Sequence, residues 1–354
     1  MDYSLFYLPT YREGFSPSLA DYYEEIIDEV KLADRLGWNR VMTTEHHFHY
    51  YGGAVTNPAI MLTAWARETK NIRLAAGVSL VPLRHPLQVA EDYAMVDQLS
   101  GGRFDMGVSR GFVPHEFAAF GVGMEETADR VSEGLDVIEK FWEGKPFSWK
   151  GKFYEFDKIQ PWPETIQKEI PIWVAASNAQ ESFERAGARG ANLMMNQYPM
   201  SYESLVQKHT WFCDAHAKAG HDPKKRRSMV AYMTHLADTE EQAIAEAKLA
   251  LQEHVNAFQH VLKHDEWNRD YLGDESILQA VNDSDDILDV FRKRTLICTP
   301  EQAAERMAKY VDLGFTEMCF VLRYGSMTHT QVCETLERLA KEVRPMLGLS
   351  KAAA

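Results

Sequence analysis

The hydrophobic pattern of residues 81–111 predicts a loop, a helix, a tight turn, a strand and a second loop, in that order. Apolar positions recur with helical spacing over residues 87–99, and a Ser-Gly-Gly sequence closes that stretch. Residues 103–108 then alternate with period two, which is typical of a strand. Arg110 and Gly111 follow at once, so an arginine lies just beyond the C-terminal end of a predicted strand.

The same alternation of strand and helix continues along the chain. Runs of alternating or continuous apolar residues predict strands at residues 3–8, 40–45, 72–80, 104–108, 171–176, 191–195, 229–236 and 316–322. Helical stripes follow the strands, and Pro17, Asn57-Pro58 and Thr299-Pro300 begin three of them. Eight strands alternating with eight helices predict an α/β fold of the (β/α)8 TIM-barrel type, formed by residues 1–354 as a single domain with insertions.

Two insertions interrupt this pattern. Residues 144–169 are rich in aromatic residues and proline, and residues 252–294 form a long polar segment. Long insertions in compact domains are often lids, so we expect residues 252–294 to be a mobile lid over the barrel mouth. The alternative architecture, an open doubly wound sheet, would carry a glycine-rich nucleotide fingerprint after its first strand. The loop there reads LPTYREGFSP, which favours the barrel.

Composition and charge narrow the function classes. The chain has 354 residues, 45% of them hydrophobic, with a net charge of -14 and a pI near 5.4. An acidic chain is poorly suited to nucleic acids and anionic membranes, and we expect neither as a partner. No apolar run is long enough to span a membrane and the N-terminus lacks a signal-peptide pattern, so we expect a cytoplasmic protein. Four scattered cysteines show no metal-ligand spacing.

Four groups of polar or special residues follow predicted strands: Glu45-His46-His47, Gly77-Val78, Ser109-Arg110 and Ser177-Asn178. The C-terminal ends of all strands face one mouth in a barrel, so we expect these groups to meet there. The arginine fork, and a serine-asparagine pair at a helix start, both suit a phosphate group. His46 at the mouth is a candidate for acid–base work. The ordinary alternatives are a surface ion pair for Arg110 and a structural hydrogen bond for His46.

The Glu-His-His-Phe-His sequence at residues 45–49 raises the question of a metal site. It lacks the HExxH spacing of helical zinc sites, and adjacent strand residues such as His46 and His47 point to opposite faces. Without a third ligand from elsewhere in the chain, we expect no metal at this position.

Short motifs are spread over nearly the full chain: EHHF at 45–48, NP at 57–58, HP at 85–86, AED at 90–92, DQLSGGRF at 97–104, RG at 110–111, PIWVA at 171–175 and TPE at 299–301. In these motifs the sequence resembles the luciferase-like flavin-dependent monooxygenase family, and its pattern is similar to that of the α subunit of bacterial luciferase. The stretch between residues 97 and 111 is the most specific part of the resemblance.

The resemblance implies a barrel that uses reduced FMN (FMNH2) and O2 to oxygenate a small, apolar organic substrate through a flavin hydroperoxide. It implies His46 as the catalytic histidine, and a flavin phosphate held by Ser109, Arg110, Ser177 and Asn178. Gly77-Val78 falls where the luciferase has a non-proline cis peptide beneath the flavin ring. A separate NAD(P)H:flavin reductase would supply the reduced flavin, and we expect a homodimer, with a heterodimer as the alternative.

Two departures from the luciferase pattern bear on these expectations. Ser109 stands where the luciferase has a reactive cysteine, and Ser177 stands where its phosphate loop has an acidic residue. Light emission also needs a second, different subunit, so we expect monooxygenation rather than bioluminescence. We expect the mouth to be lined by Phe6, Phe48 and Phe112, which suits an apolar or aromatic substrate.

Two other functions stay open for a barrel of this kind. Enzymes of the same superfamily use the deazaflavin F420 for hydride transfer without O2, and the sequence does not separate the two cofactors. A non-catalytic flavin-binding barrel is the third hypothesis. Degenerate relatives of that kind lose strand units and the catalytic histidine, whereas this chain keeps eight units and His46.

Overall fold

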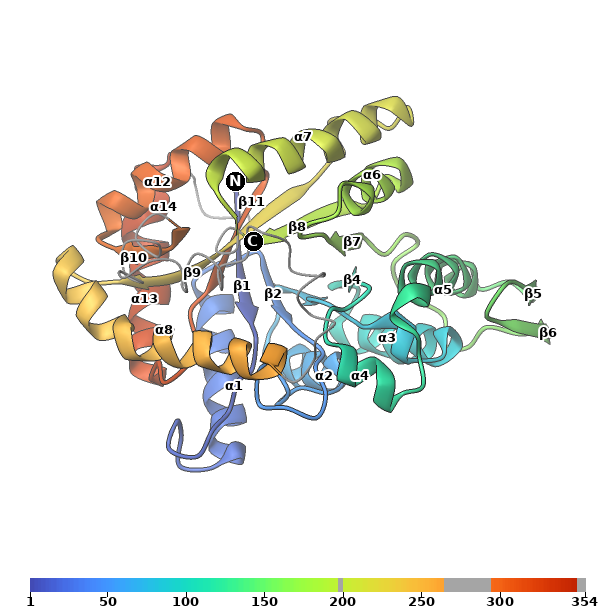
Figure 1. Ribbon diagram of the computed structural model, residues 1–354, viewed down its shortest axis with the longest axis horizontal. Helices are drawn as coiled ribbons and strands as arrows, with labels where there is room; N and C mark the ends of the chain where they lie inside the picture. Colours follow the sequence, from blue (N-terminus) through green and yellow to red (C-terminus); the bar gives the residue numbers. More distant parts are fainter. Residues whose placement is uncertain (197–199, 264–293, 349–354) are drawn as a thin grey trace.

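Eight parallel strands close into a barrel at the centre of the computed structural model, which describes residues 1–196, 200–263 and 294–348 (Figure 1). In order around the barrel the strands are β1 (Asp2–Tyr7), β2 (Arg40–Thr43), β3 (Arg73–Ala76), β4 (Phe104–Val108), β7 (Ile172–Ala175), β8 (Asn192–Asn196), β9 (Ser228–Leu236) and β11 (Glu317–Val321). Each strand pairs with the next, and β11 pairs with β1 to close the ring. The predicted (β/α)8 barrel is therefore confirmed.

Helices surround the barrel and connect its strands (Figure 1). The longer ones are α1 (Leu19–Arg35), α2 (Pro58–Glu68), α3 (Pro86–Ser100), α5 (Thr127–Trp142), α6 (Gln180–Arg189), α7 (Tyr202–Lys218), α8 (Glu240–Lys263), α12 (Pro300–Asp312) and α13 (His329–Arg338). Side chains that accept first-turn N–H groups cap several of them: Ser18, Asn57, Ser201 and Thr299. None of the helices in the described ranges combines the length and the hydrophobicity needed to cross a membrane.

Short elements complete the chain. Single 3-10 turns span Val81–Leu83 and Met124–Glu126, and α4 spans Pro114–Ala119. A π-helical turn at Leu339–Val343 leads into α14 (Arg344–Met346) near the C-terminus.

The structure differs from the expected elements at several ends. Pro17 was expected to begin the first helix, but Ser18 is the N-cap and α1 begins at Leu19. Ser177-Asn178 was expected to begin the helix after β7, but the N-cap of α6 is Ala179, which makes no side-chain hydrogen bond there. The third strand stops at Ala76 rather than at Leu80, although Ser79 still forms a bridge to Val108 of β4. The sequence pattern also missed α4 and a short strand, β10 (Leu296–Cys298), which pairs with the C-terminal part of β9.

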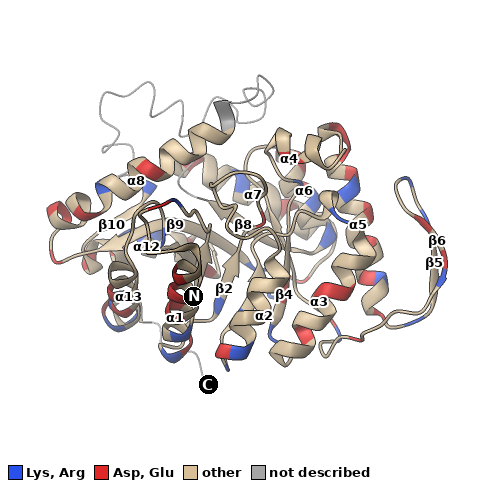
Figure 2. Cartoon of the chain, turned by 90° about the horizontal axis from the view of Figure 1, so that it is seen from below, with Lys and Arg blue, Asp and Glu red and all other residues tan. Residues whose placement is uncertain are grey.

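The structure describes the first expected insertion in full and only part of the second. The first contains an antiparallel hairpin of β5 (Phe147–Lys150) and β6 (Glu155–Ile159), which projects from the side of the barrel (Figures 1 and 2). The second was expected to be a lid over residues 252–294. Its first part, residues 252–263, is helical and completes α8, while residues 264–293 lie outside the described residues.

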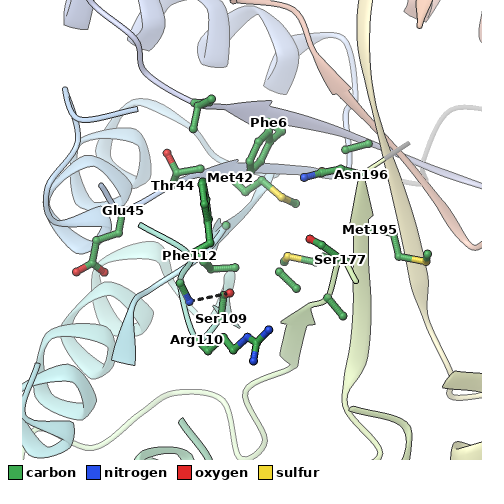
Figure 3. Close-up of a pocket in the computed structure, with 18 of the residues that line it drawn as sticks. Phe6, Met42, Thr44, Glu45, Ser109, Arg110, Phe112, Ser177, Met195 and Asn196 are labelled. Carbon is green, nitrogen blue, oxygen red and sulfur yellow. Dashed lines mark hydrogen bonds between the residues drawn. The ribbon is translucent and has the colours of Figure 1, made fainter. Parts of the chain in front are cut away.

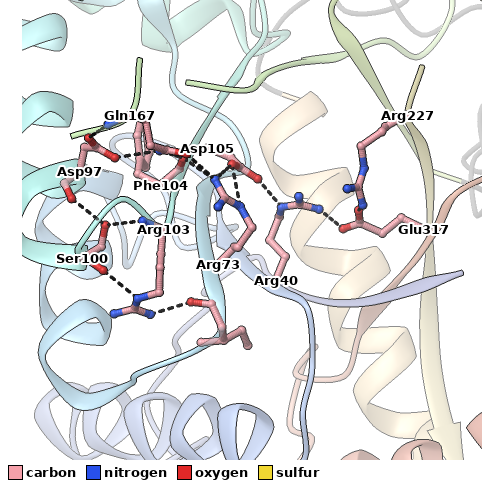
Figure 4. Close-up of polar contacts among 11 residues, drawn as sticks. Arg40, Arg73, Asp97, Ser100, Arg103, Phe104, Asp105, Gln167, Arg227 and Glu317 are labelled. Carbon is pink, nitrogen blue, oxygen red and sulfur yellow. Dashed lines mark hydrogen bonds and ion pairs between the residues drawn. The ribbon is translucent and has the colours of Figure 1, made fainter. Parts of the chain in front are cut away.

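Buried charges close the N-terminal end of the barrel (Figure 4). Arg40 on β2 donates from Nε to Asp105 Oδ2 at 2.7 Å and also pairs with Glu317 on β11. The ring of Trp173 packs against this guanidinium, 4.6 Å from ring centroid to Cζ. Burial by itself would raise the pKa of Asp105, but Arg40 and Arg73 more than offset it and lower that pKa. The network therefore joins strands that are far apart in sequence while keeping its charges paired.

The specific DQLSGGRF motif also serves this end of the barrel (Figure 4). Asp97 accepts the backbone N–H groups of Ile166 and Gln167 at 2.6 and 3.0 Å. Arg103 donates to the carbonyls of Ile72 and Ala66 at 2.6 and 3.1 Å, which satisfies backbone groups at and beyond the end of α2. The motif is thus mainly structural, and β4 carries the chain from it to the mouth.

Candidate active site

One cavity of about 240 Å³ lies at the C-terminal ends of the barrel strands (Figure 3). All the site residues expected from the sequence line it: His46, Gly77, Val78, Ser109, Arg110, Ser177 and Asn178. The expectation that these strand ends share one mouth is therefore confirmed. The chemical roles assigned to the residues stay predictions.

Polar donors gather at one end of the cavity, around Arg110 and Ser177 (Figure 3). Ser109 Oγ accepts the N–H of Gly111 at 3.2 Å, which fixes the turn that carries Arg110. Helix α6 starts close by with Ala179 as its N-cap, and the dipole of a helix N-terminus attracts an anion. A guanidinium, hydroxyl groups and a helix N-terminus form a donor set that suits the phosphate of FMN.

An apolar floor lies next to this polar end. Val78 packs against a cluster of buried side chains inside the barrel: Met42, Ala75, Trp173, Met194, Met229, Ala231 and Cys319. The Gly77-Val78 bond is a non-proline cis peptide, as expected. A Cβ on Gly77 would lie 2.8 Å from Met42 Cβ, so the backbone approaches this floor as closely as a glycine permits. The floor offers a broad apolar surface to a planar ring.

His46 lines the cavity from the end of β2 and is only 6% exposed. Its Nδ1 lies 3.1 Å from Glu116 Oε1. Its ring packs edge-on against Phe112, with 5.7 Å between ring centroids, and lies at the same distance from Tyr51. One nitrogen of the imidazole is therefore engaged by a carboxylate, while the ring borders the cavity.

Glu116 is a part of the site that sequence reasoning missed. It belongs to α4 and is fully buried, and its Oε1 also accepts the N–H of His47 at 2.7 Å and lies 3.0 Å from His49 Nε2. Burial by itself would raise the pKa of Glu116, but hydrogen bonds from His46, His49 and the His47 backbone lower it to about 2. The only local signal was Pro114, which begins a short helix after the Arg110 loop.

The structure brings together more ligand-type atoms than the sequence suggested. One such atom each from His46, His49 and Glu116 lies within 4.8 Å of the others. Hydrogen bonds between the carboxylate and the two rings account for this spacing. The expectation that no metal binds here stays a prediction.

Glu45 has a structural task at the rim of the cavity. Its Oε2 accepts the N–H of Leu80 at 2.9 Å and the hydroxyl of Ser79 at 3.2 Å, and its carboxylate is turned away from the centre of the cavity (Figure 3). It therefore anchors the loop that follows Val78.

An aromatic wall borders the other side of the cavity. Phe6 and Phe112 line it as expected, but Phe48 does not, because its side chain is 67% exposed. In its place α8 supplies Phe258, whose ring centroid lies 5.3 Å from that of Tyr51. Figure 2 shows α4 and α8 at the same end of the barrel.

Comparison with known proteins agrees with this geometry. Residues 1–317 match the family model described as luciferase-like monooxygenase. The oxygenase component of a flavin-dependent trigonelline monooxygenase from Acinetobacter baylyi is 29% identical over 333 residues, which cover 93% of this chain and 91% of that protein. The crystal structure of the monooxygenase RslO1 from Streptomyces bottropensis has 26% identity and a TM-score of 0.85, with 98% of this chain and 99% of that chain covered.

Two more distant structures show how widely the fold is shared. The oxygenating constituent of 3,6-diketocamphane monooxygenase from Pseudomonas putida, solved with FMN, has a TM-score of 0.80 at 22% identity, over 99% of this chain and all of that one. An F420-dependent secondary alcohol dehydrogenase has a TM-score of 0.75 at 17% identity, over 98% of each chain. The fold alone therefore does not choose the cofactor. The family match over most of the chain does decide its membership: this protein belongs to the luciferase-like monooxygenase family.

Proposed function

We propose that this protein is the oxygenase of a two-component monooxygenase, which uses reduced FMN and O2 to oxygenate a small organic molecule. The observation that carries the proposal is a cavity that joins a polar end, lined by Arg110, Ser109 and Ser177, to an apolar floor beneath Val78. A relative that matches over most of both chains is named as the oxygenase component of a flavin-dependent monooxygenase. A separate NAD(P)H:flavin reductase is the partner that this assignment requires.

Each part of the cavity has a task in this proposal. Arg110, Ser109, Ser177 and Asn178, with the N-terminus of α6, bind the FMN phosphate. Val78 and the methionine-rich floor support the ring system. When bound, reduced FMN supplies the electrons that activate O2. His46 moves a proton at the reacting group, and the aromatic wall excludes water from it.

The cavity lining favours an uncharged, apolar or aromatic substrate. Phe6, Tyr51, Phe112 and Phe258 offer ring faces and edges against which a planar molecule can pack. Among the described lining residues, Arg110 is the one arginine, and no lysine lines the cavity. Once that arginine holds a phosphate, an anionic substrate has no second arginine or lysine within the described lining.

We also propose that the protein forms a homodimer through neighbouring helices α2 and α3. Large apolar side chains are exposed there, at Ile60, Met95 and Leu99. Exposed large apolar side chains on neighbouring helices are a feature of interfaces between subunits. Light scattering tests this, because Ile60→Glu with Met95→Glu should convert a dimer of two 40.5 kDa chains to monomers.

The competing assignment is an F420-dependent oxidoreductase that transfers hydride without O2. The deciding experiment supplies the protein with photoreduced FMN or with reduced F420, and follows O2 consumption and product mass for a panel of ketones, aldehydes, terpenes and aromatic compounds, trigonelline included. Oxygen from 18O2 should appear in one product, and only with FMN. Turnover with F420 under anaerobic conditions would overturn the proposal.

A further inference from the structure

A fully buried carboxylate stands directly behind the histidine of the candidate active site. Glu116 reaches this position from α4, and no part of its side chain is exposed. A buried charge costs several kcal/mol unless hydrogen bonds compensate it. Three donors do so here, and two of them are imidazole rings.

The hydrogen bonds are all made by one carboxylate oxygen. Glu116 Oε1 faces His46 Nδ1 at 3.1 Å, His49 Nε2 at 3.0 Å and the His47 backbone nitrogen at 2.7 Å. An ionised carboxylate only accepts hydrogen bonds, so each ring nitrogen that faces it must carry a hydrogen. In neutral His46 the hydrogen is then on Nδ1, and Nε2 keeps its lone pair. That lone pair belongs to a ring that borders the cavity.

The loop that carries Arg110 also fixes Glu116. Gly111 adopts a left-handed conformation with φ of 77°, and a side chain there would collide with the ring of Phe117, which is fully buried. Phe117 in turn packs with Leu80 and Leu83 in a small cluster at the mouth. The backbone from Arg110 to Glu116 is therefore held by packing on both sides of its turn, which gives the carboxylate a defined position.

We infer that Glu116 is a positioning residue, which holds His46 in the Nδ1–H form with Nε2 directed to the reacting group. The inference rests on the proposed function, because it takes His46 as the group that moves the proton. In the step, a bond from the donor to hydrogen breaks and an Nε2–H bond forms, so that His46 becomes an imidazolium. Nδ1 keeps its hydrogen, and the negative charge of Glu116 offsets the new positive charge. Return of the proton to solvent restores the neutral ring.

Imidazole 15N NMR on histidine-labelled protein tests the tautomer without any turnover. Wild-type His46 should show protonated Nδ1 and unprotonated Nε2 at a pH where the ring is neutral, with His46→Gln used to assign the signals. A predominant Nε2–H form in the wild type would overturn the inference, and this measurement needs no variant of Glu116.

Glu116→Gln tests the function of the contact. The amide keeps the size of the side chain but can also donate, so the Nε2–H tautomer of His46 should appear. We expect kcat to fall by about 10²-fold, while the Kd for FMN changes by less than about two-fold, because the phosphate site is separate. Glu116→Asp should recover part of kcat, since it restores the acceptor. The matched control is His49→Gln, which removes another contact with the same oxygen and should leave kcat within about three-fold.

The outcomes separate the inference from the proposed function. If His46→Ala loses turnover while Glu116→Gln keeps it, His46 works without Glu116 and the inference is wrong, although the proposed function stands. If His46→Ala keeps full turnover, the proposed role of His46 is wrong and the inference falls with it. If His49→Gln loses as much kcat as Glu116→Gln, the carboxylate only maintains local packing, and the inference is again wrong.

Discussion

The α-carbon of Gly77 faces Met42 so closely that a Cβ added to it would lie 2.8 Å from Met42 Cβ. Real Cβ atoms do not approach this near, so Gly77→Ala must displace the floor of the cavity. We expect FMN affinity to fall by about ten-fold in this variant, which corresponds to about 1.4 kcal/mol. Met42→Ala removes Cγ and Sδ, which would lie 2.9 and 3.1 Å from the new Cβ, but it keeps Met42 Cβ, so Gly77→Ala/Met42→Ala should recover only part of the loss. Fluorescence titration of FMN measures both, and equal affinity in wild type and Gly77→Ala would contradict the contact.

Arg110 provides the second prediction, since it is the arginine at the polar end of the cavity, which we propose binds the FMN phosphate. Loss of a charge-assisted hydrogen bond costs about 1.5–3 kcal/mol, so Arg110→Ala should weaken FMN binding by roughly 10- to 100-fold. Arg110→Lys should lie between the two, because lysine keeps the charge but not the fork. Arg189→Ala is a suitable control, because Arg189 pairs with Asp136 and Glu139 and does not line the cavity. Riboflavin, which lacks the phosphate, should bind wild type and Arg110→Ala alike.

A third prediction compares two phenylalanines. Phe258 belongs to the aromatic wall, whereas Phe48 is mostly exposed beside it. Phe258→Ala should raise KM for an aromatic substrate by about 10-fold, as expected for the loss of one packed ring. Phe48→Ala should change KM by less than two-fold. Steady-state kinetics with a supplied reductase checks both, and a larger effect from Phe48 would show that the wall is wrongly placed.

Acid sensitivity is the fourth prediction. His209 is buried, where it stacks on Phe315 and contacts the hydroxyl of Ser228, and burial together with nearby Arg226 lowers its pKa to about 4. The unfolded chain, with an ordinary histidine pKa near 6.5, then binds more protons than the folded chain between pH 6.5 and pH 4. His209 alone should therefore lower the free energy of unfolding by about 3 kcal/mol as the pH drops through this window.

Urea unfolding at pH 7, 5.5 and 4.5 measures this fall. His209→Gln keeps a hydrogen-bonding group opposite Ser228 but cannot be protonated, so its stability should depend less on pH. Burial also lowers the pKa of His254 to about 4, so part of the acid sensitivity should persist in the variant. An unchanged pH dependence in His209→Gln would show that His209 does not contribute.

The fifth prediction concerns metal ions. If hydrogen bonds account for the grouping of His46, His49 and Glu116, dialysis against EDTA should leave turnover unchanged. Elemental analysis of the purified protein should then find less than about 0.1 equivalent of any transition metal per chain, which is the level of trace contamination. Loss of turnover that returns with one specific divalent ion would contradict this prediction.

The parts of the fold that follow local periodicity were predictable from the sequence. The strand Phe104–Val108 has the expected ends, and Asn57 caps α2 as expected. Local signals of this kind depend on residues only a few positions apart, so they can be recognised in a single sequence. The same reasoning brought the expected site residues to one mouth, because a barrel places all strand ends together.

Contacts between distant segments were not predictable in this way. Glu116 meets His46 from 70 residues away, and nothing in the local sequence of either residue indicates the partner. The prediction that the Phe48 side chain lines the cavity was also wrong. Its φ of 65° is not that of a strand, so the alternation of side chains along a strand does not extend to it. The short strand β10 was not predicted, because three residues are too few to show the two-residue alternation of a strand. The motif at Asp97–Phe104 correctly indicated the family. Its side chains, however, hold the backbone at the N-terminal end of the barrel and do not line the cavity.

The charge network at the N-terminal end of the barrel has a consequence for how the chain acquires its fold during synthesis. Arg40 needs Asp105 and also Glu317, which follows it by 277 residues and lies in the last strand. Until that strand arrives, a nascent barrel would have to bury a guanidinium with half of its counter-charges missing. Packing of the early strands into a compact intermediate is therefore only weakly favourable. A ribosome-bound chain truncated before Glu317 should stay sensitive to protease.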